Sequence, residues 1–351
     1  MRRWFRDAHF RSLLKNSGYL AASKVVAAVC GVATLAFAGR GLGPVLFGML
    51  VLINSYVQAA SGISKFQSWQ LIIRYGSPAI AKGDSKPLQD ATGFAFGLDV
   101  ASGLLGMVAA IALLPLIGTW FGIDQSYIGL AMLYCLLLPT MAAATPTGVL
   151  RSLDRFDLIS WQTTVNPIAR ATLAGIAWWN ELPLPYYVAI WFVTDLVGDL
   201  FGWFLAAREL KRRELLSGIR PTLRPSTLPG AWGFAIKVNM NSTLAAAWGP
   251  VANLLVGGIV GPAAAGLYRI AKGLADSVNK PSDMLGRAFY PEVMRLDFAT
   301  KHPWRLMMRG ASLSGAIGAL AILVIVVGGE PLMRLCSVRA LSARSRCCWS
   351  C

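Results

Sequence analysis

Charged residues are scarce in this sequence of 351 residues: they make up 14%, against about 25% in an ordinary soluble domain. Hydrophobic residues make up 55%, so a soluble fold would lack the polar surface needed to cover its core. A bilayer removes this problem, because runs of about 18 or more apolar residues can cross its hydrocarbon core as helices. The composition excludes a soluble domain and predicts an all-α membrane protein, a polytopic helical bundle.

Histidine is also scarce, and the residue sets that catalysis requires are missing. His9 and His302 stand in polar segments without a partner for acid–base or metal chemistry. The sequence contains no Ser–His–Asp set, no metal-ligand spacing and no phosphate-binding loop. We therefore predict that the protein is not an enzyme, with no catalytic residues, no metal and no cofactor.

A cleavable signal peptide is lacking too, although the first residues are basic. The net charge is +16, and the Lys and Arg residues lie in segments between apolar runs. This distribution is typical of a topology signal and of attraction to phospholipid headgroups, and no nucleic-acid-binding motif competes with it. We expect the phospholipid bilayer, and no nucleic acid, as a partner.

The apolar runs predict about nine membrane spans. Basic residues fall in alternate connections, which places the N-terminus in the cytoplasm of a bacterial cell with the protein in its inner membrane. The predicted spans are 17–38, 44–65, 90–117, 127–148, 163–180, 184–207, 233–256, 264–286 and 310–329.

A basic, proline-containing segment, 208–232, divides the chain into two lobes. We predict a complete lobe of six helices over 1–207, this segment as a cytoplasmic linker, and an incomplete second lobe over 233–335. The final segment, 336–351, changes abruptly to Ser, Arg and Cys. Without histidine it fits no zinc spacing, so we interpret it as an out-of-frame tail that truncates the second lobe.

Both lobes begin with the same turn. Gly43-Pro44 with Gly48 follows the first span, and Gly261-Pro262 with Gly266 follows the seventh, each matched pair 218 residues apart (261 − 43). Glycine ends one helix, proline begins the next, and the second glycine lets a neighbouring helix approach closely. The pattern predicts a parallel pseudo-two-fold repeat, which is typical of transporters with a substrate cavity between two lobes; two unrelated tight turns are the alternative.

Basic residues inside predicted spans are candidate functional positions, because a charge in the bilayer is costly unless it faces protein or water. Cations that converge from several helices could bind a pyrophosphate, which arginine holds with two parallel hydrogen bonds. Snorkelling to the membrane surface is the alternative. These candidates are Lys24, Arg170, Lys237, Arg269 and Lys272.

Three acidic residues, Asp99, Asp195 and Asp199, also fall inside spans. Asp195 and Asp199 are four residues apart and share a helix face, where two carboxylates at low dielectric do not both ionise. One of them would take a proton or bind a cation, which suits ion-coupled transport. An ion pair with Arg or Lys of the same lobe is the alternative.

Several short motifs resemble those of the Wzx-type polysaccharide and oligosaccharide flippases of the multidrug/oligosaccharidyl-lipid/polysaccharide exporter superfamily. They occur in the order and topology of that family, over about residues 15–335. The motifs are Arg40-Gly41-Leu42-Gly43-Pro44 with Phe47-Gly48, Gly148-Val149-Leu150-Arg151-Ser152-Leu153-Asp154-Arg155-Phe156, Gly261-Pro262-Ala263-Ala264-Ala265-Gly266-Leu267-Tyr268-Arg269-Ile270-Ala271, and Tyr290-Pro291-Glu292.

The resemblance implies that the protein moves undecaprenyl-pyrophosphate-linked oligosaccharide to the outer leaflet during surface polysaccharide synthesis, by alternating access through a cationic cavity. It implies this lipid-linked oligosaccharide, and other polysaccharide assembly proteins, as partners. A cation-coupled drug exporter of the same superfamily is one alternative, although its cavity should be acidic. A truncated, inactive remnant of a flippase is another. A membrane enzyme would need a large outer loop or catalytic module, which the sequence does not show.

Overall fold

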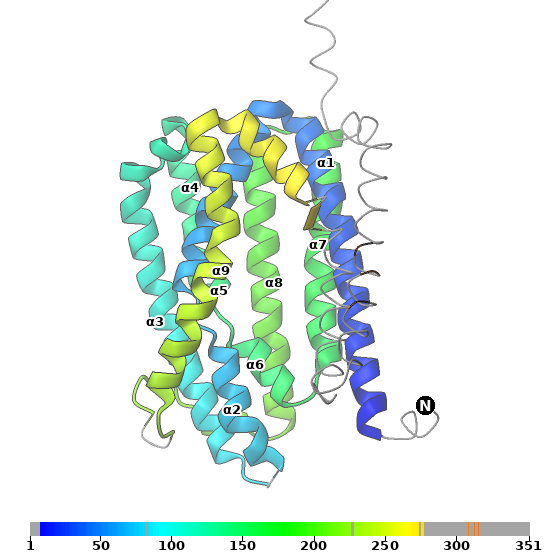
Figure 1. The fold of residues 1–351 in the computed structure, drawn as a ribbon, viewed down its shortest axis with the longest axis vertical. Helices are drawn as coiled ribbons and strands as arrows, with labels where there is room; N and C mark the ends of the chain where they lie inside the picture. The colour runs from blue at the N-terminus through cyan, green and yellow to red at the C-terminus, as the bar shows by residue number, and fades with distance from the viewer. Residues whose placement is uncertain are drawn as a thin grey trace, which may run out of the picture.

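The computed structural model describes residues 8–81, 83–225, 228–273, 275–276 and the single residues 308, 312 and 315. Within these residues every regular element is a helix, which confirms the predicted helical class (Figure 1). The helices are α1 (Ala8–Ser64), α2 (Ser68–Ala81), α3 (Lys86–Ile117), α4 (Ile128–Cys135), α5 (Leu138–Met141), α6 (Thr145–Ser152), α7 (Phe156–Trp179), α8 (Leu184–Arg212) and α9 (Ala231–Val260), with short 3-10 turns η2 (Thr119–Phe121), η3 (Gln125–Tyr127) and η4 (Leu216–Gly218).

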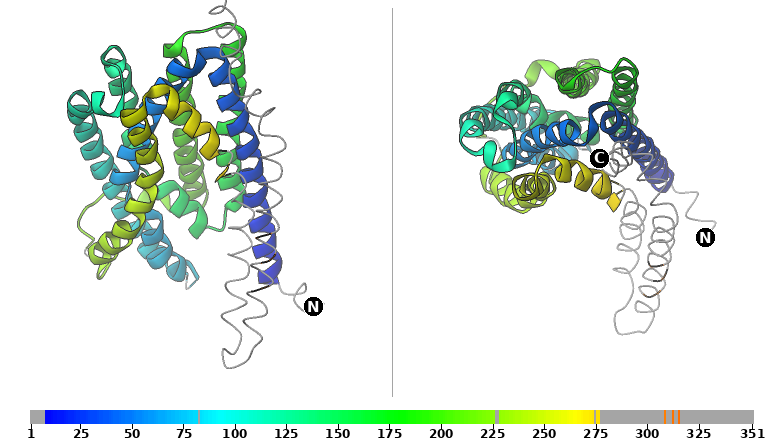
Figure 2. Two further views of the ribbon diagram at one scale, coloured as in Figure 1. Left: turned by 45° about the horizontal axis from the view of Figure 1, so that its top comes forward. Right: turned by 90° about the horizontal axis from the view of Figure 1, so that it is seen from above.

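The first two predicted spans form the two halves of α1. The backbone breaks at Gly43, whose φ of 72° is outside the helical range, and Pro44 follows directly. A positive φ costs glycine little, and proline tolerates the first turn of a helix. Figures 1 and 2 show the chain reaching one end of the bundle, turning there and running back toward α2.

The fourth predicted span, 127–148, is broken rather than continuous. Helical stretches Gln125–Cys135 and Leu138–Ser152 meet at an angle of 51°. Prolines begin both α5 and α6, where a missing backbone N–H removes no helical hydrogen bond. The carboxylate of Asp99 on α3 accepts hydrogen bonds from the first backbone N–H groups of α6, so the break is satisfied internally, as a bilayer requires.

The segment between the second and third spans, predicted as a cytoplasmic loop, contains α2. This helix packs on α3 and α6, where Leu71 and Ile72 are buried. Its basic residue Arg74 lies over the ring of Phe234 at 4.4 Å. The apolar runs did not reveal this helix, because its 14 residues are fewer than a membrane span needs.

By length and composition, three described helices can cross a membrane: Ser23–Ser64, Lys86–Ile117 and Leu184–Arg212. The bent pair of the fourth span would be another. Large apolar side chains such as Leu105 and Ile259 are 72% and 82% exposed, which suits a surface facing lipid. The ninth predicted span, apart from residues 312 and 315, and the tail 336–351 lie outside the described residues.

The connection between α8 and α9 falls within the predicted linker and packs against α3. Helix α8 continues to Arg212 and α9 begins at Ala231, so 213–230 is the connection. The backbone N–H of Thr222 donates to the carbonyl of Gly93 on α3 at 3.2 Å. A β-carbon on Gly93 would lie 2.2 Å from the carbonyl oxygen of Arg220, so only glycine admits the linker there.

Candidate functional site

A cavity of about 520 Å³, the central cavity, lies where both halves of α1 meet α7, α8, α9 and the helical segment that follows Gly261. Each of the two Gly-Pro turns therefore contributes the helices on both of its sides. Side chains from these elements make part of the lining polar. The polar lining includes Asn54, Gln58, Asn166, Arg170, Arg269 and Asp276.

A second cavity, of about 290 Å³, adjoins the central cavity, because Gln58 and Pro250 line both. Its charged lining is Lys65, Asp195 and Asp199. Lys65 follows directly after α1, and its ammonium group donates to the carbonyl of Met141 at 3.3 Å. The two polar cavities therefore lie next to each other along the second half of α1.

Arg170 of α7 forms an ion pair with Asp195 of α8. Its Nε donates to the hydroxyl of Thr194 at 2.9 Å, and its guanidinium lies 5.4 Å from the ring centroid of Trp191. Arg170 lines the central cavity and Asp195 lines the second one, so the pair stands where the two cavities meet.

The second oxygen of Asp195 is held from another direction. The hydroxyl of Tyr134, on α4, donates to this oxygen at 2.6 Å, and the amide of Asn54, on α1, donates to the Tyr134 oxygen at 2.9 Å. Tyr134 is only 1% exposed. This chain of hydrogen bonds ties the lining of the central cavity to Asp195.

Asp199 lies one turn beyond Asp195 on α8. Its Oδ2 is buried and has no hydrogen-bond partner among the described residues. Of the described groups that line the second cavity, Lys65 is the cation that shares the space with Asp199. The two carboxylates predicted to share a helix face therefore do line one cavity.

The charges that line these two cavities are balanced, in contrast to the cationic cavity expected from the sequence. The described lining carries three cations, Arg170, Arg269 and Lys65, and three carboxylates, Asp195, Asp199 and Asp276. The difference arises because each of these three basic residues shares its cavity with an acidic one, which lowers the cost of burying either.

The other predicted cations lie elsewhere. Lys24 and Lys237 are exposed and do not line either cavity as the described residues form it. Lys272 is half-buried, with its ammonium group 3.2 Å from the point where a β-carbon on Gly249 of α9 would stand. The structure thus brings Arg170 and Arg269 to one cavity and leaves the three lysines outside its lining.

Asp99 has a different environment from Asp195 and Asp199. It is fully buried on α3 and accepts four hydrogen bonds, all at 2.7–2.8 Å, from the hydroxyls of Ser68 and Thr145 and the backbone N–H groups of Ala144 and Thr145. A carboxylate at the N-terminus of a helix satisfies its free N–H groups. The geometry gives Asp99 a capping role at the break in the fourth span, away from both cavities.

The two Gly-Pro turns contact each other at one end of the bundle. Gly43 and Gly261 both have positive φ, 72° and 108°. A β-carbon on Gly48 would lie 1.8 Å from the carbonyl oxygen of Pro262, and one on Gly266 would lie 3.2 Å from the Cα of Gly48. The close approach expected of these glycines is therefore made between the turns themselves. Figure 1 shows the bend in α1 and the end of α9 at the same end of the bundle.

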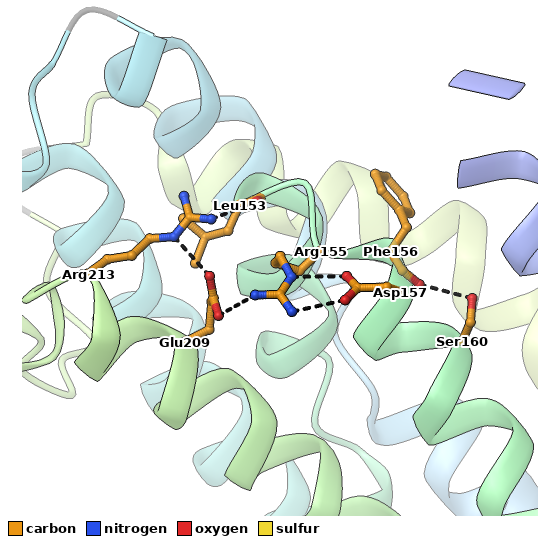
Figure 3. Close-up of polar contacts among 7 residues, drawn as sticks. All are labelled: Leu153, Arg155, Phe156, Asp157, Ser160, Glu209 and Arg213. Carbon is orange, nitrogen blue, oxygen red and sulfur yellow. Dashed lines mark hydrogen bonds and ion pairs between the residues drawn. The ribbon is translucent and has the colours of Figure 1, made fainter. Parts of the chain in front are cut away.

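A separate ion-pair cluster, the α7–α8 clasp, joins the start of α7 to the end of α8 (Figure 3). Arg155 binds both oxygens of Asp157, at 3.0 and 2.9 Å, and also Glu209 at 2.6 Å. Arg213 binds the other oxygen of Glu209 at 3.0 Å and the carbonyl of Leu153 at 3.2 Å. The hydrogen bonds from Arg155 lower the pKa of Asp157, and the same bonds raise that of Arg155.

Sequence reasoning missed two residues of the site. Lys65 was not a candidate because it is the last residue of its predicted span, 44–65, and nothing in the local sequence shows that it shares a cavity with Asp199. Tyr134 stands in the apolar run Leu133-Tyr134-Cys135, where its single hydroxyl is a faint signal. Its importance comes from Asp195 and Asn54, which are 61 and 80 residues away in the chain.

Three comparisons relate the chain to known proteins. The sequence profile of the family described as polysaccharide biosynthesis protein matches residues 13–291. An inner membrane protein of Escherichia coli (strain K12), YghQ, is 41% identical over 337 residues, which are 95% of each chain. A solved structure, the inward-facing conformation of a multidrug resistance MATE family transporter of the MOP superfamily, has a TM-score of 0.58 at 15% identity over 94% of this chain and 74% of that one.

Proposed function

The chain belongs to the polysaccharide biosynthesis protein family, and from that premise we propose that it flips a lipid-linked oligosaccharide across the bacterial inner membrane. The substrate class would be an undecaprenyl-pyrophosphate-linked glycan, moved from the cytoplasmic to the outer leaflet. The observation that carries the proposal is that Arg170 and Arg269, on separate helices, line one cavity. The fold resemblance to a transporter supports the mode of transport.

The pyrophosphate group is the part of such a substrate that these residues can recognise. Its charge and its tetrahedral oxygens suit guanidinium groups, which form paired charge-assisted hydrogen bonds. A volume of about 520 Å³ lies in the range of ordinary small-molecule sites, about 300–1,000 Å³. Such a space admits a head group and leaves a long lipid tail to the bilayer.

The movement would be an alternation of two lobes, 1–207 and 233–335, about the linker. In the described state the Gly-Pro turns meet at Gly48 and Pro262, which closes that end of the bundle. With the N-terminus in the cytoplasm this end is the outer one, and the cavities would open inward. Outer opening would separate Gly48 from Pro262.

Transport into proteoliposomes tests the proposal. The protein is reconstituted with a fluorescent undecaprenyl-pyrophosphate oligosaccharide, and the label that reaches the opposite leaflet is quenched or cleaved from one side. We expect Arg170→Gln and Arg269→Gln each to slow transport by about 100-fold, because loss of one partner of a charge pair costs about 2–5 kcal/mol. Arg208→Gln, at an exposed arginine of α8, is the matched control and should transport at the wild-type rate. Transport by both cavity variants at the control rate would contradict the proposal.

A second candidate, export of an organic cation, is favoured by the three carboxylates of the lining. Burial of a cationic substrate would use Asp195, Asp199 or Asp276 as a counterion. The same vesicles, loaded with a cationic dye, distinguish the two candidate functions. Export of the dye that the pyrophosphate-linked lipid does not inhibit would favour the cation exporter over the flippase.

A further inference from the structure

The ion pair between Arg170 and Asp195 raises a problem for any anion that binds in the central cavity. The guanidinium that would attract a phosphate already has a carboxylate partner. An anion placed beside Arg170 brings a second negative charge next to Asp195, and like charges in a poorly solvated site repel strongly. The cavity can bind an anion tightly only if the charge of Asp195 is removed or compensated.

The geometry leaves Arg170 capable of such an exchange. Its Nε and Nη2 donate to Thr194, Asp195 and Asn166, whereas the two N–H groups of Nη1 have no hydrogen-bond partner among the described residues. Arg170 lines the central cavity and its side chain is 20% exposed. An incoming phosphate oxygen can therefore engage Nη1 first and then compete for Nη2.

The surroundings of Asp195 supply a place for a proton. Asp195 faces Arg170 on α7, Tyr134 on α4, Asp199 on its own helix, and Lys65 across the second cavity. Its Oδ2 stays bound to the Tyr134 hydroxyl, so Oδ1, the oxygen that Arg170 holds, is the one that becomes available. Asp199, one turn along α8, has a buried oxygen without a partner among the described residues and lines the same cavity as Asp195. Two carboxylates so close in a poorly solvated site can share one proton.

We propose that the Arg170–Asp195 pair is a proton-dependent counterion switch, in which a phosphate anion replaces Asp195 on Arg170 and the Asp195–Asp199 pair takes up one proton. The proton comes from water in the second cavity and bonds to a carboxylate oxygen; no other bond is made or broken. The inference rests on the proposed anion site at Arg170 and adds a coupling to it. By reciprocity, protonation of the pair must strengthen anion binding by the factor by which the anion favours protonation.

Calorimetry with inorganic sulfate tests the switch in the purified full-length protein. Sulfate is a tetrahedral dianion that does not itself titrate between about pH 5 and 8, so any proton taken up belongs to the protein. Titrations in buffers of different ionisation enthalpy count that proton. We expect the wild type to take up about one proton per sulfate, and its affinity to fall by about tenfold per pH unit wherever that proton must be taken up on binding.

The variants identify the groups involved. The double variant Asp195→Asn with Asp199→Asn should bind sulfate with no proton uptake. At alkaline pH its sulfate affinity should be about tenfold higher than that of the wild type, since one like charge no longer opposes the anion. Asp276→Asn removes a carboxylate from the same central cavity and should keep the proton uptake. Arg170→Gln should bind no sulfate; if it does not fold, Arg170→Lys should bind more weakly with the uptake preserved.

The outcomes separate the switch from the proposed function. Sulfate binding that depends on Arg170 but takes up no proton would overturn the switch and leave the anion site standing. Loss of proton uptake in Asp276→Asn would also overturn it, because the wrong carboxylates would have been assigned. If neither the folded wild type nor the folded double variant binds sulfate, the anion site and the switch are both wrong.

Discussion

Helices α7 and α8 are joined twice by an arginine and a carboxylate, and the two joints differ in how completely their polar groups are used. In the α7–α8 clasp, Arg155 forms ion pairs with Asp157 and Glu209, and Glu209 also forms one with Arg213. In the cavity pair, Arg170 forms an ion pair with Asp195, while Asp199, one turn away, has a buried oxygen for which the described part of the chain offers no partner. A saturated cluster stabilises one arrangement, and an unsaturated one can exchange partners.

Burial and position reinforce this difference. Glu209 is 5% exposed, and no residue of the clasp is among the described residues that line either cavity. Arg170 and Asp195 are each part of a cavity wall. The comparison therefore predicts that the clasp stabilises the fold and that the cavity pair serves the transport proposed above, although both use the same chemistry on the same two helices.

Glu209→Gln should have the largest effect on stability. It leaves Arg155 and Arg213 without their shared partner, and breaking a buried ion pair costs about 3–5 kcal/mol. Thermal unfolding in detergent measures the loss. Glu214→Gln changes an exposed glutamate close by and should stay within about 0.5 kcal/mol of the wild type. Equal unfolding temperatures for the two variants would end the assignment of stability to the clasp.

The same substitution, arginine to lysine, should give opposite results at the two joints. Arg170→Lys keeps the charge but loses the planar fork, so transport should fall about tenfold with little change in unfolding. Arg155→Lys cannot bind Asp157 with two hydrogen bonds and also Glu209, so it should lower stability by about 1–2 kcal/mol, mainly through Glu209, with transport per folded molecule unchanged. Transport assays and unfolding curves of both variants test this expectation. If each variant loses both transport and stability, the clasp and the cavity pair do not differ in role.

The sequence predicted the helical fold and part of the cavity because both leave local signals. Apolar runs predict helices, and a lone Arg170 in such a run is conspicuous because burying a charge is costly. Gly43-Pro44 and Gly261-Pro262 mark turns for the same local reason. The helix α2 and the break between α4 and α6 were missed, since α2 is too short to give an apolar run of membrane length and Pro146 alone does not show where a span bends.

Other parts of the site depend on contacts between residues far apart in the chain. Asp99 and Asp195 give the same signal, an acid in an apolar run, yet one caps α6 and the other lines a cavity. The role of each carboxylate follows only from the partner that packing brings to it. Asp99 is bound by Thr145, and Asp195 is bound by Arg170. The cationic cavity was predicted from the basic residues considered one at a time, and their acidic neighbours come from other helices or other turns.

The smallest expected effect concerns acid and the exposed member of the clasp. Arg155 lowers the pKa of Asp157, so its contribution to stability is present above the pKa that an unfolded aspartate has, about 4, and is lost as the pH falls through the lower folded value. The side chain of Asp157 is 42% exposed, and screening by water and salt limits the contribution to about 0.5 kcal/mol. Unfolding of the wild type and Asp157→Asn should therefore differ slightly at neutral pH and converge in strong acid, and the gap should narrow in high salt. A gap that stays constant through the acid range would mean that Asp157 acts through packing, and the clasp would then depend on Glu209 alone for its charge.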